Sequence, residues 1–247
     1  MSRLRSATSL LLILISAAVA GAQEIPPGTA LPLKLDTRLD ENTASSGQRI
    51  FATVAQDVPL PSGGKIRAGS RVSGRVLQAG RKGDGSSYIR LRFDQVSANG
   101  RDMAITTSLR ALAPPRDVQD AQQPLHGPVY AESPANWTTT QVGGDVVYRG
   151  GGHVMHDTTL VGDPVKGGVL AVLTEVRFPG CETSSGDRRL ALWVFSSNAC
   201  GAYGFGPLKI AHAGDTTPLG EVVLQSSKNV RVYAGSGMLL ITVSKPQ

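Results

Sequence analysis

The sequence predicts an all-β protein, a barrel or sandwich of short antiparallel strands, with a β-rich insertion that carries a disulfide bond. Three observations support this fold class. Apolar and polar residues alternate with a period of two, as in strands buried on one face. Clusters of Gly, Pro, Ser, Asn and Asp separate these runs and are typical of turns. No helical periodicity follows the first 22 residues.

The first 22 residues have the three zones of a secretory signal peptide. Met1 to Arg5 carries two cations, 7–20 is apolar, and Ala20-Gly21-Ala22 fits the small-residue rule for cleavage. We expect cleavage after Ala22, with Ala20 as the alternative. The apolar run is too short for a permanent membrane span, and no later stretch approaches the roughly 20 apolar residues that one needs. The sequence therefore predicts a periplasmic or secreted protein without a transmembrane segment after cleavage.

The sequence predicts a first β-barrel module in the next part of the chain, 23–112. Leu31, Leu33 and Leu35 alternate with Lys34 and Asp36, which indicates a strand with one buried face. Similar patterns predict further strands at 50–58, 65–76, 89–94 and 103–109. Asn99-Gly100 is a strong signal for a tight hairpin turn.

The rest of the chain divides into three predicted segments. Residues 113–140 are polar, contain prolines and lack a period, so we expect a linker or long loop. Residues 141–218 form the β-rich insertion, in which 190–195 is apolar on both faces and predicts a fully buried strand. Residues 219–247 supply the closing strands of the barrel.

The two cysteines predict a structural disulfide. Cys181 and Cys200 are the only cysteines of the chain, and pairing is the rule in an exported protein. Closing a loop of this length stabilises the fold by about 3 kcal/mol in the chain-entropy model. The alternative is a reactive pair of thiols, but the C-x-x-C spacing of redox proteins is absent.

Four segments carry a resemblance to a known family. Residues 25–35, 52–58 and 64–76 look like successive strands of one barrel, and 230–243 is similar to its closing strand pair. Together they resemble the periplasmic β-barrel domain of the TrbI-like scaffold proteins of conjugation and type IV secretion machines. The resemblance covers 26–110 and 219–243, and it implies a barrel fold and a role in assembly at the cell envelope.

The chain also departs from that family. Its scaffolds cross the inner membrane once, run a proline-rich stretch through the periplasm and carry a helical pair that projects into the outer membrane. This chain begins instead with a cleavable signal, and residues 111–218 replace the helical region. The resemblance therefore extends to the barrel and not to the membrane-spanning parts.

Positive charge is concentrated in the first half of the chain. The formal net charge is +6, and the range 49–110 holds eleven Lys and Arg against four Asp and Glu. One interpretation is a solvated outer strand face, and the other is a contact surface for an anionic glycan or lipid of the envelope. The residues proposed for that contact are Arg67, Arg71, Arg75, Arg90 and Arg92. Nucleic acid is not expected, because this region lacks a platform of stacking aromatic residues.

His153 and His156 are the best candidates for metal binding or catalysis. Glycines precede them and polar residues follow, which indicates a loop or strand, and on a strand residues three apart point to opposite faces. Neither a G-x-S-x-G elbow nor a glycine-rich phosphate motif is present, so we expect no cofactor. The leading hypothesis is a non-catalytic exported β-barrel module that acts as an envelope assembly or binding protein. The alternative is a small periplasmic hydrolase or metal-binding protein that uses the His153/His156 region.

Overall fold

The computed structural model describes most of the barrel and parts of the insertion. The described residues are 25–61, 63–98, 100–123, 138–142, 146–148, 154–156, 159–162, 169–172, 191–196, 199–211 and 220–244. Among them, no helix has the length and apolar character needed to cross a membrane. The predicted signal peptide lies outside the described residues.

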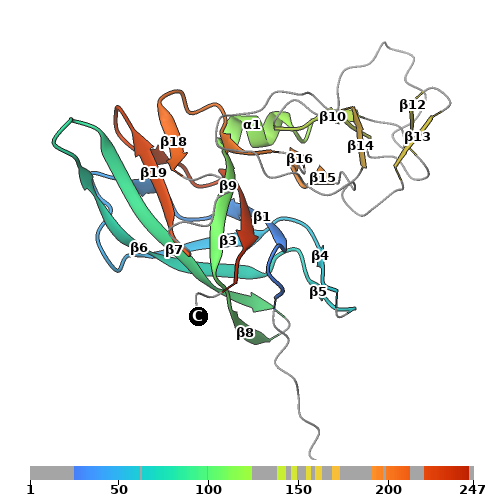
Figure 1. The fold of residues 1–247 in the computed structure, drawn as a ribbon, viewed down its shortest axis with the longest axis horizontal. Coiled ribbons are helices and arrows are strands. Elements are labelled where there is room, and N and C mark those ends of the chain that lie inside the picture. The colour runs from blue at the N-terminus through green and yellow to red at the C-terminus, as the bar shows by residue number, and fades with distance from the viewer. Residues whose placement is uncertain are drawn as a thin grey trace, which may run out of the picture.

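One ten-stranded sheet forms the body of the protein (Figure 1). Its strands, in spatial order, are β17 (Gly201–Ala202), β9 (Thr107–Ala113), β21 (Gly237–Thr242), β1 (Ala30–Leu35), β3 (Arg49–Val54), β6 (Arg71–Arg81), β7 (Ser87–Ala98), β19 (Val222–Ser226) and β18 (Leu208–Ala211), and β8 (Arg101–Ala104) pairs with β7. All neighbours are antiparallel except β17 and β9. The two end strands, β17 and β18, follow each other in the chain and contact each other, so the sheet bends into a nearly closed barrel. The all-β prediction is confirmed.

Short strand pairs and one helix complete the described structure. Two ribbons pack against the barrel core: β2 (Leu39–Asp40) with β20 (Arg231–Val232), and β4 (Val58–Pro59) with β5 (Lys65–Ile66). The remaining elements are α1 (Pro115–Asp120), the sheet of β10 (Thr138–Thr140), β11 (Val146–Tyr148) and β14 (Val169–Val172), the pair β12 (Val154–His156) and β13 (Thr159–Gly162), and the pair β15 (Ala191–Leu192) and β16 (Phe195–Ser196).

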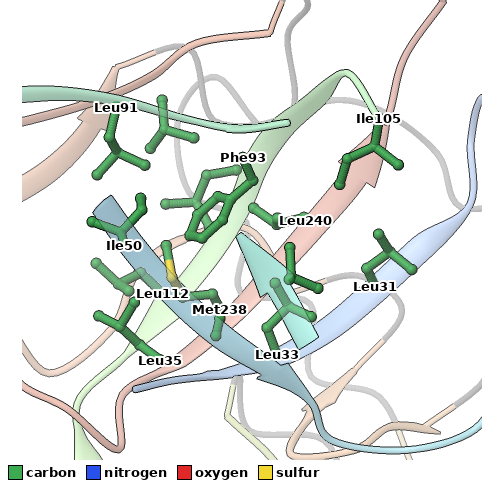
Figure 2. Packing of buried hydrophobic residues seen from close by; sticks show 14 of the residues in the cluster. Leu31, Leu33, Leu35, Ile50, Leu91, Phe93, Ile105, Leu112, Met238 and Leu240 are labelled. Carbon is green, nitrogen blue, oxygen red and sulfur yellow. The ribbon is translucent and has the colours of Figure 1, made fainter. Parts of the chain in front are cut away.

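The barrel interior is filled by the alternate apolar residues of its strands. Leu31, Leu33 and Leu35 of β1 are fully buried, and Phe93 of β7 lies in the same cluster as Met238 of β21 (Figure 2). Burying one such side chain stabilises the fold by about 1.5–3 kcal/mol. Because successive side chains of a strand point to opposite faces, the alternating apolar residues of each strand all face the barrel interior.

A second apolar cluster covers the outside of the barrel at β9 and β21. Ala111 and Leu239 face outward there, yet both are fully buried. Val118 of α1 and Phe195 of β16 cover them, and both approach Gly237 so closely that a Cβ atom at Gly237 would lie 2.9 Å from Val118 and 3.1 Å from the Phe195 ring. The part of the chain between β9 and β17 is thus packed on the barrel wall through these residues.

The structure differs from the sequence prediction in the range 113–140. Helix α1 occupies part of the expected linker. Pro114 is its N-cap residue, and Pro115 is its first helical residue. Proline favours this position because its φ angle suits the first turn and its missing N–H would be unpaired there anyway. Six residues are too few to show a helical period. The barrel also takes β17 and β18 from the range that the sequence assigns to the insertion.

The prediction of one buried strand over 190–195 is wrong. The chain instead forms a hairpin in which Leu192 pairs with Phe195, and Trp193 and Val194 make the turn. Trp193 has a φ of 59°, a left-handed conformation that glycine or asparagine normally supplies. Its N–H donates to Gln56 Oε1, and its carbonyl accepts a 2.8 Å bond from Gln141 Nε2. These contacts hold a conformation that costs a large residue about 1–3 kcal/mol.

Ion pairs hold the β2–β20 ribbon in place. The Asp40 side chain is only 8% exposed, and its Oδ2 accepts hydrogen bonds from Arg38 Nη2 at 3.0 Å and Arg231 Nε at 2.9 Å. The other oxygen accepts two bonds from Asn42. Next to it, Glu41 accepts a 2.9 Å bond from Arg81 at the end of β6. The ribbon is thereby tied to the long strands of the sheet.

Replacing Asp40 with asparagine should destabilise the protein in a pH-dependent way. Burial alone would raise the pKa of Asp40, but hydrogen bonds from Asn42, Arg231 and Arg38 outweigh burial and lower it below 3.8. A lowered pKa stabilises the folded state at pH values above the unfolded pKa, and this stabilisation is lost as the pH falls through the folded pKa. We expect Asp40→Asn to cost about 2 kcal/mol at pH 7. The difference from wild type in urea denaturation should shrink below about pH 4, and a constant difference down to pH 2 would contradict this account.

Candidate anionic-surface site

Four arginines gather on the outer face of β3, β6 and β7, around one phenylalanine. We call Arg49, Phe51, Arg71, Arg75 and Arg92 the arginine face. Residues on either side of them in the sequence, such as Ile50, Val72 and Leu91, are buried in the barrel, so the alternation of each strand directs the arginines outward. All four arginines are exposed.

Three of these arginines form a row across neighbouring strands. In the strand register, Arg49 of β3 lies opposite Arg75 of β6, which lies opposite Arg92 of β7. Like charges directly opposite each other destabilise a sheet. Asp94 relieves part of this repulsion: its Oδ2 lies 2.6 Å from Arg75 Nη2 and 3.6 Å from Arg92 Nε. One carboxylate thus serves two arginines of the row, and the arginine face keeps an excess of positive charge.

Phe51 contacts the two arginines of this face that have no carboxylate partner among the described residues. The guanidinium carbon of Arg49 lies 5.5 Å from the centre of the Phe51 ring, and that of Arg71 lies 5.3 Å from it. Each contact is a cation–π interaction worth about 0.5–1 kcal/mol at an exposed site. Within the described residues, neither arginine forms an ion pair or a side-chain hydrogen bond. Their N–H groups therefore remain available to an external anion.

The other two arginines proposed from the sequence stand apart from this cluster. Arg90 faces outward on β7, but it is bound to Glu221, the residue before β19, by hydrogen bonds of 2.5 and 3.0 Å. Arg67 is exposed in the turn between β5 and β6, and its carbonyl accepts a 3.1 Å bond from the Ser70 N–H. The structure therefore brings Arg71, Arg75 and Arg92 together and leaves Arg67 and Arg90 outside the arginine face.

Sequence reasoning missed Arg49 and Phe51. The signal was present, because Arg49 and Phe51 alternate with the buried Ile50 and Ala52 and so share an outward face. Their role depends on the pairing of β3 with β6, which places Phe51 opposite Ser73 and diagonal to Arg71. The residues of β3 and β6 do not reveal that these two strands are neighbours in the sheet, so this pairing could not be predicted from the sequence.

Two further sequence predictions remain untested. His153 lies outside the described residues and His156 ends β12, so the metal or catalytic hypothesis for this pair stays a prediction. Cys200 is buried beside the start of β17, and its N–H donates a 3.0 Å bond to the Tyr203 hydroxyl. Cys181 lies outside the described residues, and the disulfide with Cys200 also stays a prediction.

Neither metal ligands nor comparisons with other proteins point to a further site. In the part of the chain that the structure describes, no three or more His, Cys, Asp or Glu side chains lie together as metal ligands would. A scan against protein-family models finds no match to this chain, and a search of curated proteins finds none either. The arginine face is therefore the candidate functional surface of the described residues.

Proposed function

We propose that this protein is a non-catalytic, exported β-barrel module that binds the anionic surface of the cell envelope through its arginine face. The observation that carries the proposal is the pair Arg49 and Arg71, which Phe51 holds in place without a carboxylate partner among the described residues. The predicted signal peptide supports the location, and the resemblance to TrbI-like barrels supports a role at the envelope.

Phosphate is the anionic group that this surface suits best. A guanidinium presents several N–H donors in a planar fork that matches phosphate oxygens, and stacking on a ring lowers the entropy lost on binding. Phospholipid headgroups and phosphorylated polysaccharide both present such groups at high density. Each arginine near an anionic membrane contributes about 1 kcal/mol to binding, and the contribution falls off within a Debye length.

Reversing the charge of the unpaired arginines should abolish binding to anionic vesicles. The double variant Arg49→Glu/Arg71→Glu keeps the Asp94 ion pairs intact but removes both available guanidiniums. We expect the mature wild-type protein to sediment with phosphatidylglycerol vesicles in 0.1 M salt, and the double variant to lose at least tenfold in affinity. Raising the salt to 0.5 M should weaken wild-type binding in the same assay, because the Debye length shrinks.

A matched double variant controls for net charge. Arg101 on β8 and Arg116 on α1 are both exposed and lie outside the arginine face, so Arg101→Glu/Arg116→Glu changes the net charge by the same amount. It should lose less than threefold in affinity. Equal loss in both double variants would show that net charge alone drives binding. Sedimentation with phosphorylated polysaccharide and not with vesicles would assign the surface to glycan phosphate.

A further inference from the structure

Among the described residues, the most exposed aromatic side chain lies directly beside the β2–β20 ribbon. Tyr233 follows β20 directly, and at 46% it is the only large hydrophobic side chain among the described residues that is exposed. Its neighbours in the ribbon, Val232 and Leu39, are fully buried and anchor the strand pair. A ring that is exposed on a rigid support is a ready contact surface, since little entropy is lost when a ligand covers it.

Two arginines frame the Tyr233 ring. The guanidinium carbon of Arg38 lies 5.4 Å from the ring centre. Arg231 and Tyr233 are exposed on either side of the fully buried Val232, so the alternation of the strand places them on the same outer face. Both arginines bind the same oxygen of Asp40, at 3.0 and 2.9 Å. Because the buried Asp40 carboxylate binds both guanidiniums, their positions relative to the Tyr233 ring are already fixed in the unliganded protein.

Arg38 and Arg231 keep an excess positive charge and several N–H donors that an external anion could bind. Two guanidiniums share one carboxylate, so one positive charge is in excess. A guanidinium has five N–H donors, and the bonds to Asp40 use one donor of Arg38 and one of Arg231. The side chains of Arg38 and Arg231 are 55% and 41% exposed, which places remaining donors at the surface. Asn42, also exposed, donates its Nδ2 to Asp40 and keeps its Oδ1 as an acceptor.

We propose that Arg38, Arg231 and Tyr233 form a binding subsite for a carboxylate-bearing sugar unit. The planar donor fork of arginine matches a carboxylate, and the C–H face of a pyranose ring can stack on the tyrosine ring beside it. Asn42 Oδ1 can accept a bond from a sugar hydroxyl. The subsite uses none of the residues of the arginine face, so the inference does not depend on the proposed phosphate contact.

Calorimetric titration with tetragalacturonate tests the proposal. We expect the mature wild-type protein to bind this acidic oligosaccharide, and Tyr233→Ala and Arg38→Gln each to weaken binding at least tenfold. Arg116→Gln, which removes an exposed arginine elsewhere, should change the affinity less than twofold. Maltotetraose, a neutral oligosaccharide, should not compete. Thermal melting of each variant checks that the ribbon still folds.

Three results would overturn the proposal. The first is the absence of binding to the wild-type protein, and the second is full retention of affinity in Tyr233→Ala. The third is equal or tighter binding of tetraglutamate, which would identify an acidic peptide as the ligand. The variant Arg49→Glu/Arg71→Glu should bind tetragalacturonate normally, so failure here and failure of the vesicle experiment are distinguishable.

Discussion

Replacing Gly74 with alanine should cost the protein about 3 kcal/mol or more, one of the two largest effects that the structure predicts. Gly74 lies in β6 at a point where β7 approaches closely. A Cβ atom there would lie 2.0 Å from the Arg92 carbonyl oxygen and 2.9 Å from the Phe93 Cα. Both atoms belong to the main chain of the neighbouring strand, so no side-chain rotation can relieve the overlap. The two strands would have to separate at the centre of the sheet, and urea denaturation followed by circular dichroism should show a large fall in midpoint.

Gly80 supplies the control for this substitution. It lies in the same strand, and a Cβ atom there would meet only the Tyr88 side chain, at 3.6 Å or more, which is ordinary van der Waals contact. Gly80→Ala should therefore change the free energy of unfolding by less than about 1 kcal/mol. If both variants lost the same stability, the close approach of the two backbones would not be the cause.

Truncating Phe93 to alanine should destabilise the barrel by about 3–5 kcal/mol, the range for a large aromatic residue removed from a core. Phe93 is 1% exposed and projects into the interior between strands on different sides of the barrel (Figure 2). Its removal leaves a cavity, and the closed sheet around it allows little collapse. Urea denaturation measures the loss, with an unchanged slope as evidence that the folded state remains compact.

Phe51, which faces outward, supplies the control for the substitution of Phe93. It lies on β3, and its ring is held between Arg49 and Arg71 on the surface. Phe51→Ala should cost about 1–2 kcal/mol, the sum expected from two exposed cation–π contacts. It should also weaken vesicle binding, because both guanidiniums lose their support. A loss of stability as large as that of Phe93→Ala would place Phe51 in the core and would contradict the described face.

The alternation of apolar residues was sufficient to predict an all-β fold, either a barrel or a sandwich. Leu31, Leu33 and Leu35 face inward as their spacing requires, and the Asn99-Gly100 signal stands between β7 and β8, where Ala98 pairs with Arg101. These features could be predicted because a strand with one buried face records its orientation in its own residues.

The hairpin at Trp193 and the row of Arg49, Arg75 and Arg92 could not be predicted in the same way. A tight turn is recognised by Gly or Asn, whereas Trp193 adopts the left-handed conformation because Gln56 and Gln141, distant in sequence, bind its backbone. The row of Arg49, Arg75 and Arg92 depends on the register of three strands. Both features depend on contacts between segments that are distant in the sequence, and such contacts produce no local sequence pattern.

The return of the chain to the barrel has a consequence for how this fold can diversify. The chain leaves β9 at Ala113 and re-enters the sheet at Gly201, which pairs directly with Ala111. Neighbouring strands are about 4.8 Å apart, and doubling the length of a loop costs only about 0.6 kcal/mol. Evolution can therefore lengthen, shorten or exchange the intervening segment while the barrel keeps its pairing. The constraint that any replacement must satisfy is to cover the apolar outer wall at Ala111 and Leu239.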